Sequence, residues 1–466
     1  MQADEWLPGG EASVSYKPFP SFMLPAANLP AAAKPDFYAG KALANQPWIK
    51  APAVTDARDG LGPVYNARTC LACHINGGRG QVPVDGNSAL FAAFVRISLP
   101  GEDLQHGAVA EPIYGHQLQG QSVALSHQLR HSTPQKYLSE SSNSPVEVPP
   151  EAYVYIDWQQ KIFSYTDAEQ IELRYPVLRI EQLGYGALDQ QTLFSLRSAP
   201  AIHGMGLLEL IPQAAIAQLA DADDRNQDGI SGRMNQVWNY QTGEQVPGRF
   251  GWKANRADLH ITTAAAFNGD VGITTPLFPL QPCSDQQPLC LKTPNGNNAE
   301  GVELPAELLA LVTNFTRNLG VPKRRRLEGL AAAERAQGRT LFYQIGCAAC
   351  HQPSFITDAG LTDNQHLAEQ KIWPYSDLLL HDMGAELADG RPDYLATGSE
   401  WRTPPLWGIG LSQQVNGNYF LLHDGRARSV EEAILWHGGE AETVKQKFVY
   451  LEKYQRSALL NFVESL

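Results

Sequence analysis

Two short segments of this 466-residue chain repeat one arrangement of cysteine and histidine. Cys70-Leu-Ala-Cys-His74 and Cys347-Ala-Ala-Cys-His351 are both C-x-x-C-H motifs, the pattern that attaches haem c covalently to a protein. Cysteines at this spacing share one face of a helical turn, so both thiols can bond the vinyl groups of one porphyrin. The histidine that follows can bind the haem iron. The motifs therefore predict two covalently attached haem c groups, held by Cys70, Cys73, Cys347 and Cys350, with His74 and His351 as iron ligands.

Two other chemistries use cysteine pairs with this spacing, namely redox-active dithiols and zinc sites. A structural zinc site needs four ligands, and neither motif has a second cysteine or histidine pair close by in the sequence. The complete motif also occurs twice and uses four of the six cysteines. Haem attachment is therefore the favoured interpretation, with dithiol and zinc chemistry as the alternatives.

The other two cysteines indicate where the protein works. Cys283 and Cys290 flank a short polar loop, and a local disulfide between them requires an oxidising compartment. Haem c is also attached outside the bacterial cytoplasm, so both observations predict a periplasmic protein. The first residues of the chain lack the basic and apolar regions of a signal peptide, and we expect that such a peptide has been removed.

The overall composition is that of a globular protein. Hydrophobic residues make up 43% of the chain, but no stretch approaches the roughly 20 apolar residues that span a bilayer, so the protein is not expected to be membrane-spanning. The net charge of −13 argues against nucleic acid as a partner, because phosphates need a basic surface. An acidic surface would suit a redox partner protein such as a small cytochrome or a cupredoxin, although it also serves simple solubility.

The pattern along the chain predicts three regions. Residues 1–55 are rich in proline and alanine without periodicity, which indicates an extended N-terminal arm. Residues 56–322 contain the first motif, strand-like alternation between about 88 and 185, and the disulfide loop at 281–300. Residues 323–466 contain the second motif. The expected fold is mainly α, with two cytochrome c-like haem domains, a β-rich insertion in the first of them, and long irregular loops.

Two helices are expected to enclose the second haem. Apolar residues recur at helical spacing from Leu330 to Ile345 and lead directly into Cys347. Ser429 and Glu432 have the spacing of a capping box, which starts another helix, and an apolar stripe then continues to the end of the chain. A helix before the motif and a helix at the chain end would cross and cover the porphyrin.

One polar loop has features of a calcium site. Asp224, Asn226 and Asp228 lie at alternate positions before Gly229, as in the opening of a calcium-binding loop. The bidentate glutamate expected at the twelfth position is absent, because Asn235 stands there. The segment is therefore a candidate calcium site, with a turn rich in Asx side chains as the alternative.

Several further segments make the chain resemble the bacterial di-haem oxidoreductase family, whose members are described as peroxidases or as thiol oxidoreductase-like. The resemblance extends over residues 60–466. It rests on Asn66-Ala-Arg-Thr-Cys-Leu-Ala-Cys-His74, Asp228-Gly-Ile-Ser-Gly-Arg233, Gly248-Arg-Phe-Gly-Trp-Lys253, Pro374-Tyr-Ser-Asp-Leu-Leu-Leu-His-Asp-Met-Gly384, Glu400-Trp-Arg-Thr-Pro-Pro-Leu-Trp407 and His423-Asp-Gly-Arg-Ala427.

More distantly, the chain is similar to di-haem cytochrome c peroxidases and to the enzyme that matures a tryptophan-derived quinone. These relatives imply one six-coordinate electron-transfer haem, one haem with an accessible face, and a tryptophan between the two haems. The predicted β-rich insertion departs from the smaller peroxidases, so their substrate is not carried over.

The resemblance implies roles for four residues near the accessible haem. Asp270 falls where related peroxidases carry an acid, and a carboxylate there could pass a proton between the oxygens of peroxide. Trp252 aligns with the tryptophan between the haems. His203 and His260 are auxiliary catalytic candidates. The alternatives are a turn residue for Asp270, an aromatic core residue for Trp252 and structural roles for the two histidines.

The second haem needs a ligand on its other face, and Met383 and His381 are the candidates. Methionine ligation raises the reduction potential and suits electron transfer. Related peroxidases place this methionine just before a Lys/Arg-x-Pro segment, but the corresponding position near Glu400 offers none. His423 and Arg426 are expected to organise the haem propionates or the interface between the domains.

Together these features predict a periplasmic di-haem oxidoreductase of the peroxidase type. The second haem would pass electrons through Trp252 to the first, whose open iron would react with peroxide or oxidise a partner. Two other functions stay open, an electron carrier with both irons six-coordinate and a haem-bearing sensor or partner in iron uptake. An accessible iron distinguishes the first function from the other two.

Overall fold

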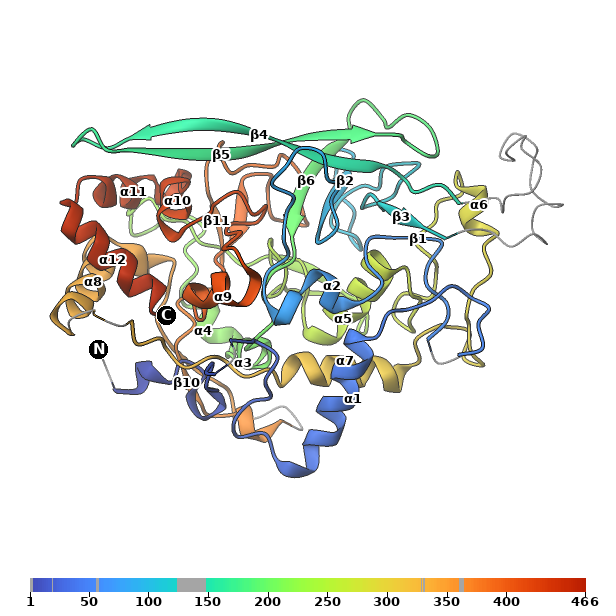
Figure 1. Ribbon diagram of the computed structural model, residues 1–466, viewed down its shortest axis with the longest axis horizontal. Helices are drawn as coiled ribbons and strands as arrows, with labels where there is room; N and C mark the ends of the chain where they lie inside the picture. The colour runs from blue at the N-terminus through green and yellow to red at the C-terminus, as the bar shows by residue number, and fades with distance from the viewer. Residues whose placement is uncertain are drawn as a thin grey trace.

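The computed structural model describes residues 3–18, 20–55, 58–123, 148–327, 329, 332–359 and 364–466. Leu330, in the predicted helix, and residues 124–147, in the predicted β-rich region, lie outside this set. Helices contain 29% of the chain and strands 18%, so helix predominates, although less than a mainly α fold would require. The described strands pair only in small two-stranded sheets. Figure 1 shows most helices on one side of a long β-hairpin.

The first half of the chain contains a close crossing of two helices, α1 (Lys34–Asn45) and α7 (Ala306–Arg317). Gly40 lies at the crossing point. A Cβ at this position would overlap the carbonyl oxygen of Leu311 and lie 2.7 Å from its carbonyl carbon. The absence of a side chain therefore allows the two backbones to touch.

The second half contains the same crossing, made by α8 (Ala332–Gln344) and α12 (Lys453–Glu464). Gly338 lies at this crossing point, and a Cβ there would overlap the carbonyl oxygen of Ala458 and lie 2.7 Å from its carbonyl carbon. In Figure 1 this pair is at the left, and α1 with α7 is to the right of the centre.

Matching aromatic pairs stand beside the two crossings. Phe37 packs on Phe315 with ring centroids 5.3 Å apart at 56°, and Phe342 packs on Phe462 at 5.4 Å and 56°. Each half is therefore built on the same helical frame, one helix before its C-x-x-C-H motif and one after it. The crossing predicted for the second half is present, and the first half repeats it.

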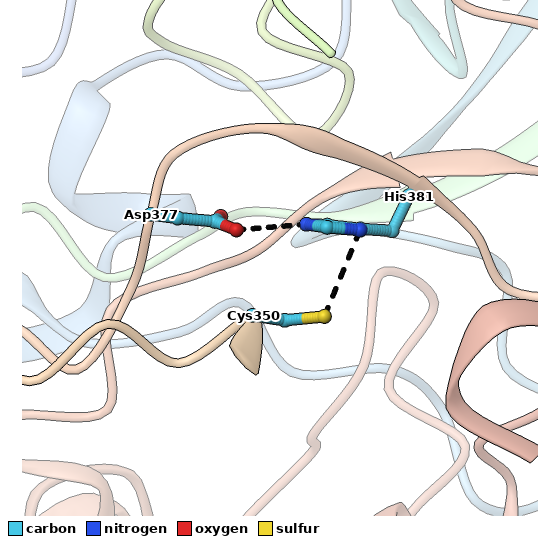
Figure 2. A group of neighbouring side chains, drawn as sticks. All are labelled: Cys350, Asp377 and His381. Carbon is cyan, nitrogen blue, oxygen red and sulfur yellow. Dashed lines mark hydrogen bonds and ion pairs between the residues drawn. The ribbon is translucent and has the colours of Figure 1, made fainter. Parts of the chain in front are cut away.

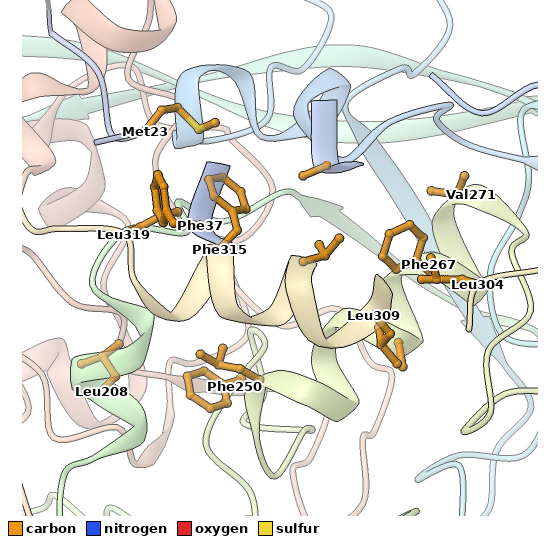
Figure 3. Close-up of a cluster of buried hydrophobic side chains, with 14 of the residues drawn as sticks. Met23, Phe37, Leu208, Phe250, Phe267, Val271, Leu304, Leu309, Phe315 and Leu319 are labelled. Carbon is orange, nitrogen blue, oxygen red and sulfur yellow. The ribbon is translucent and has the colours of Figure 1, made fainter. Parts of the chain in front are cut away.

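The two crossings lie in separate hydrophobic clusters. Figure 3 shows the first cluster, in which side chains of α1 and α7 meet Phe250 and Phe267. The second cluster surrounds α8 and α12 and includes Trp436 and Phe448. Burial of such side chains contributes about 25 cal/mol per Å² of apolar surface removed from water, so each half has its own source of stability.

The strands pair antiparallel throughout the described residues. β4 (Tyr153–Ser164) and β5 (Gln170–Glu181) form the long hairpin. The other pairs are β1 (Val64–Tyr65) with β3 (Gln121–Ser122), β2 (Ala93–Ser98) with β6 (Leu193–Ser198), β7 (Gln236–Asn239) with β8 (Glu244–Pro247), β9 (Phe355–Ile356) with β10 (Lys371–Ile372), and β11 (Leu380–Asp382) with β12 (Glu400–Arg402).

The long hairpin corrects the prediction of a β-rich insertion confined to the first domain. Strands do form within residues 88–185, but the hairpin reaches the C-terminal half, where Tyr165 and Leu173 are buried in the second cluster. Arg456 of α12 also forms an ion pair of 3.1 Å with Asp167. Alternation along a strand shows that one face is buried but not which part of the chain buries it, so the sequence could not reveal this contact.

Helix α1 corrects the prediction that residues 1–55 form an extended arm. Phe37, Gly40 and Ala44 are its buried residues, and their spacings of three and four place them on one face. Pro35 lies in the first turn, where proline is tolerated. The buried stripe consists largely of glycine and alanine, so its hydrophobicity differs little from that of the exposed face. The sequence therefore gave only a weak helical pattern here.

Shorter helices complete the fold. The predicted cap at Ser429 is present, because its side chain accepts a hydrogen bond of 3.0 Å from the Glu432 backbone N–H. The predicted disulfide joins Cys283 to Cys290. Among the described helices, none has the length and apolar character needed to cross a membrane. The remaining helices are α2 (Cys70–Cys73), α3 (Met205–Glu209), α4 (Gln213–Ala217), α5 (Leu259–Ala266), α6 (Pro288–Leu291), α9 (Ser412–Asn416), α10 (Val430–Leu435) and α11 (Glu442–Val449).

Candidate functional site

The first C-x-x-C-H motif forms a capped helical turn, α2. The Thr69 hydroxyl accepts a hydrogen bond of 3.0 Å from the Ala72 N–H, which fixes the start of the turn. The His74 N–H donates to the Cys70 carbonyl at 2.9 Å, so the histidine follows directly on the same turn. The local geometry therefore places two thiols and an imidazole side by side, as the spacing predicts.

The orientation of His74 is set by a backbone carbonyl. Its Nδ1 lies 2.7 Å from the carbonyl oxygen of Pro200. A carbonyl oxygen only accepts hydrogen bonds, so Nδ1 carries the hydrogen and Nε2 keeps its lone pair. Histidines that bind metals are held in this way, with one nitrogen donating to a fixed acceptor and the other free to coordinate.

The second motif repeats this arrangement. Cys347 begins a short helical turn after Gly346, which has a φ of 106° that suits only glycine. The His351 N–H donates to the Cys347 carbonyl at 3.0 Å, and His351 Nδ1 lies 2.9 Å from the carbonyl oxygen of Tyr375. Nε2 of His351 is therefore also left free to coordinate a metal.

The four motif cysteines are half-buried, and none forms a disulfide. Burial raises the pKa of the Cys70 thiol to about 12, and the nearby Asp270 carboxylate adds to this effect. Burial also raises the pKa of Cys347 to about 12. These cysteines are therefore neutral thiols at pH 7, whereas reactive dithiols have thiols with lowered pKa values.

A large, mostly apolar cavity lies beside the second motif. It encloses about 1330 Å³ between protein atoms, its open mouth included. The residues that line it are mostly apolar, which suits an apolar group. Its lining contains the three reactive residues of the motif together with Phe342, Leu406, Val430, Ile434, Leu459 and Val463.

His381 also lines this cavity, but two carboxylates hold both of its nitrogens. Nε2 lies 2.8 Å from Asp377, as Figure 2 shows, and Nδ1 lies 2.7 Å from Glu440. Burial alone would lower the pKa of His381, but these hydrogen bonds, that to Asp377 first, hold the pKa well above its usual value. His381 is therefore an imidazolium without a free lone pair. Its Nδ1 also lies 3.6 Å from the Cys350 sulfur.

The group of Cys350, Asp377 and His381 is close enough to hold a metal ion by itself, since one ligand atom from each lies within 4.8 Å of the others. These three residues are the candidate ligands for zinc, the alternative to haem attachment. The ion pairs of His381 argue against it, because zinc needs a neutral imidazole and a deprotonated thiol.

Two arginines bring positive charge to the apolar cavity. Arg79 Nη1 donates to the Leu422 carbonyl at 3.1 Å, and Arg402 Nε donates to the Gly251 carbonyl at 2.8 Å. Neither guanidinium has a carboxylate ion pair within the described ranges of the chain. Loss of water contact lowers the pKa of each to about 10, and the charge of Arg79 lowers that of Arg402 further. Two such cations favour an anionic group in the cavity.

Trp252 contacts the surroundings of both motifs. Its indole Nε1 donates to the Ser198 carbonyl at 2.8 Å, two residues before the Pro200 carbonyl that holds His74. Its buried ring lines the apolar cavity of the second motif, and the Arg79 guanidinium lies over it at 5.2 Å. Trp252 thus contacts the segment before Pro200 and also lines the cavity of the second motif.

His423 and Arg426 lie at the same junction but have different surroundings. His423 lines the cavity, stacks on Trp401 at 3.6 Å and accepts a hydrogen bond at its carbonyl from the Ser198 N–H. Arg426 is paired with Asp424 at 2.7 Å and does not line the cavity. The role of Arg426 at the haem propionates or at the interface between the domains stays a prediction.

Asp270 lies next to the first motif. Its backbone carbonyl accepts hydrogen bonds from the N–H groups of Asn66 and Ala67, at 2.8 Å and 3.0 Å. Its carboxylate accepts one of 2.8 Å from Gln117. Burial raises the pKa of Asp270, although the Gln117 hydrogen bond and then the charge of Arg96 oppose this shift. The structure therefore brings a carboxyl group with a raised pKa close to the thiols of Cys70 and Cys73.

A second, polar cavity begins at Gln117. It encloses about 1040 Å³ between protein atoms, its mouth included, and Arg96, Arg256 and His116 also line it. Burial lowers the pKa of His116 to about 3, and Nδ1 of this ring has no hydrogen-bond partner among the described residues. Asp270 does not line this cavity, but its neighbour Gly269 and its hydrogen-bond partner Gln117 do.

The two auxiliary histidines do not line either cavity. The His203 ring lies 4.0 Å from the Phe22 ring at a tilt of 36°, and its Nε2 lies 3.1 Å from the Trp407 carbonyl. His260 is a half-buried residue of α5 whose Nδ1 lies 3.4 Å from the Thr313 hydroxyl. The auxiliary role of both histidines stays a prediction.

The candidate calcium loop folds as a turn stabilised by its own side chains. The Asp224 carboxylate accepts a hydrogen bond of 3.0 Å from the Asp228 N–H, and the Asn226 side chain accepts another of 3.0 Å from the same group. Asn226 Nδ2 also donates to the Asp228 carboxylate at 3.1 Å. The Asx turn is therefore present, and calcium binding stays a prediction.

Sequence reasoning missed three residues that line the cavity of the second motif, Arg79, Arg402 and His437. The arginines belong to different halves of the chain, so only the fold brings them together. His437 gave a local signal, because it closely follows the capped helix α10 and precedes Gly438 and Gly439.

A sequence model of the family described as "Di-haem oxidoreductase, putative peroxidase" matches residues 7–466. The chain belongs to this family. Membership agrees with the resemblance that the motifs carry and supports an oxidoreductase role with haem. A search of curated proteins finds no match. A solved structure of hydrazine synthase from Kuenenia stuttgartiensis is similar at 15% identity over 58% of this chain and 73% of that one, with a TM-score of 0.29, which is too low to support an argument.

Proposed function

We propose that this member of the di-haem oxidoreductase family is a periplasmic peroxidase-type enzyme with haem c attached at both motifs. One observation carries the proposal. Each motif presents two unpaired thiols beside a histidine whose Nδ1 donates to a carbonyl, so that Nε2 is free to bind iron. When bound, the haem groups would supply one-electron chemistry at iron.

The second site fits such a group well. Cys347 and Cys350 would attach it, and His351 would bind its iron in a cavity of apolar character. Haem also carries two propionate carboxylates. Arg79 and Arg402 are two cations without ion-pair partners among the described residues of this cavity, and they match that requirement in charge and number.

Asp270 is the proposed proton carrier near the first site. A group that takes a proton from one peroxide oxygen and gives it to the other must be partly protonated near neutral pH. Burial raises the pKa of Asp270 toward this range, and Gln117 fixes its carboxylate at 2.8 Å. The polar cavity lined by Arg96, Arg256 and His116 would admit peroxide and water to this residue.

Trp252 is proposed to connect the sites. An indole that contacts the Ser198–Pro200 segment on one side and the cavity of His351 on the other shortens the gap an electron must cross. Arg79, which lies over the ring, would disfavour a positive charge on the indole. This arrangement favours passage of an electron over lasting oxidation of the tryptophan.

The repeated helix crossings support a division into two cytochrome c-like units, residues 56–322 and 323–466. In each, a helix before the motif crosses a later helix at a glycine, Gly40 in α1 and Gly338 in α8. Because α1 lies within residues 1–55, the first unit would extend into the predicted arm. The disulfide supports the periplasmic location, since it requires an oxidising compartment.

The test is made on protein exported by a bacterium with a haem c attachment system. Intact mass is expected to show two haem groups, and Cys70→Ser with Cys73→Ser is expected to remove one of them. The wild-type protein is expected to show a high-spin ferric signal and to oxidise a reduced small cytochrome when peroxide is added. Two low-spin haems that ignore peroxide in every redox state would favour the electron carrier instead. Zinc without attached haem would establish the metal site of Cys350, Asp377 and His381.

A further inference from the structure

Four histidines line the apolar cavity of the second motif: His351, His381, His423 and His437. His351 belongs to the attachment motif. An iron with an axial histidine on one face can take a second protein ligand on the other, and this choice decides whether the centre transfers electrons or binds a small substrate. The surroundings of the other three rings distinguish them.

His437 is held as the two motif histidines are held. Its Nδ1 lies 2.7 Å from the carbonyl oxygen of Ala433, and a carbonyl oxygen can only accept a hydrogen bond. Nδ1 therefore carries the hydrogen, and Nε2 keeps its lone pair. His74 and His351 have the same arrangement with the carbonyls of Pro200 and Tyr375, at 2.7 Å and 2.9 Å.

The other two rings are less suitable. His381 has carboxylates on both nitrogens, so it has no lone pair to offer while those ion pairs last. His423 lies flat against Trp401, at 3.6 Å between ring centroids and 9° between planes, and its Nε2 is 3.7 Å from Asp424. A histidine ligand must point its nitrogen at the iron. The stacking on Trp401 already fixes the orientation of the His423 ring, so His423 is a less suitable ligand.

The residues after His437 fix its position. Gly439 has a φ of 54°, and a Cβ there would overlap the Asp382 carbonyl and lie 2.9 Å from its carbon. A Cβ on Gly438 would lie 3.0 Å from the Met383 carbonyl oxygen. The two glycines therefore let the segment pack on the end of β11, and Glu440 then binds His381. Each residue from 437 to 440 thus has a defined contact, and His437 lines the cavity with an Nε2 for which no partner is found among the described residues.

We propose that His437 is the second axial ligand of the iron bound at His351. This inference rests on the proposed function, because it requires haem at the second motif. It assigns a six-coordinate, bis-histidine centre to the second site, which would then transfer electrons and leave peroxide chemistry to the first site. Met383, which lines the same cavity, becomes a packing residue.

The test compares spin states in haem-loaded protein by electron paramagnetic resonance and absorption spectroscopy. His437→Gly is expected to convert one of the two haems from low spin to high spin, and added imidazole is expected to restore the low-spin signal. Met383→Leu, the matched control from the same cavity, is expected to keep the wild-type spectrum. An unchanged spectrum in His437→Gly, or loss of the low-spin signal in Met383→Leu, would overturn the assignment.

A second variant covers the case in which His437→Gly does not fold. His437→Met keeps a sixth ligand, and it is expected to raise the reduction potential of one haem only, because methionine favours the reduced iron. An unchanged potential would also overturn the assignment. Intact mass separates the two proposals: a protein without haem at Cys347 and Cys350 refutes the proposed function, whereas two attached haems with unchanged spectra refute the ligand alone.

Discussion

Replacement of Glu440 by glutamine tests the ion pairs that hold His381. In the wild-type protein the Glu440 carboxylate accepts hydrogen bonds from His381 Nδ1 at 2.7 Å and from the Ser231 N–H at 3.0 Å, both through one oxygen. Its other oxygen accepts from the Asp382 N–H at 3.1 Å and from the Ser231 hydroxyl at 2.8 Å. A glutamine can keep one acceptor, but its amide NH₂ must then face two donors.

The expected loss of stability in Glu440→Gln follows from these contacts. The pair is well buried, with 3% of the His381 side chain and 10% of the Glu440 side chain exposed. Removing one partner of a buried ion pair costs roughly 3–5 kcal/mol when the other is left alone. His381 retains Asp377 at 2.8 Å, so the loss should lie at the lower end, about 3 kcal/mol in the free energy of unfolding.

The pH dependence has a definite sign. The folded-state pKa of His381 is raised, so the stability that it contributes is complete below its unfolded pKa of about 6.5 and is lost as the pH rises through the folded value. The pKa of Glu440 is lowered by His381 although burial opposes this, so its contribution is lost as the pH falls below about 4.3 toward the folded value. The difference in the free energy of unfolding between the wild-type protein and Glu440→Gln should thus be largest near pH 6 and should decrease at alkaline pH.

Urea denaturation followed by circular dichroism measures this difference at pH 6 and pH 9. Glu442→Gln is the matched control, since Glu442 pairs with Lys445 at the surface and its side chain is 48% exposed. The control is expected to change stability by about 0.5 kcal/mol or less. The loss of stability in Glu440→Gln could be no larger than that of the control, or it could increase with pH. Either result would refute the assignment of His381 as an imidazolium between two carboxylates.

Three further outcomes are expected. Asp270→Asn should leave both haems attached but slow the reaction with peroxide by about a hundredfold, measured by stopped-flow absorption, and unchanged kinetics would remove Asp270 from the reaction. Gly338→Ala should lower the free energy of unfolding by about 1–3 kcal/mol because its Cβ overlaps Ala458, while Gly120→Ala, with no atom closer than 3.8 Å, should change it far less. Thr69→Ala should lower stability by about 1 kcal/mol in urea, and no change would show that the cap is dispensable.

Local patterns in the sequence predicted the parts of the site that lie close together in the chain. The two motifs fold as short turns because their spacing and caps are local, and the Ser429 cap begins α10 for the same reason. The helix crossing of the second half was also predictable from its apolar stripe. In the first half the stripe is short and rich in glycine and alanine, so α1 was missed.

Contacts between distant segments could not be predicted from one sequence. Arg79 and Arg402 meet in one cavity only because both halves contribute to it. His381 has the residue type of an iron ligand, but Glu440, one of its two carboxylate partners, lies 59 residues further along the chain. Family resemblance supplied Asp270 and Trp252, and the structure adds the Gln117 and Ser198 contacts that orient them. Whether they act in catalysis stays a prediction.

The long β-hairpin has a consequence for how the protein is made. Tyr165 and Leu173 are translated well before residues 341–466, which bury them. A chain that emerges N-terminus first therefore carries an unfinished apolar surface until its last helix, α12, has arrived. Until then the hairpin exposes these apolar side chains, and a partly folded chain of this kind is prone to aggregate.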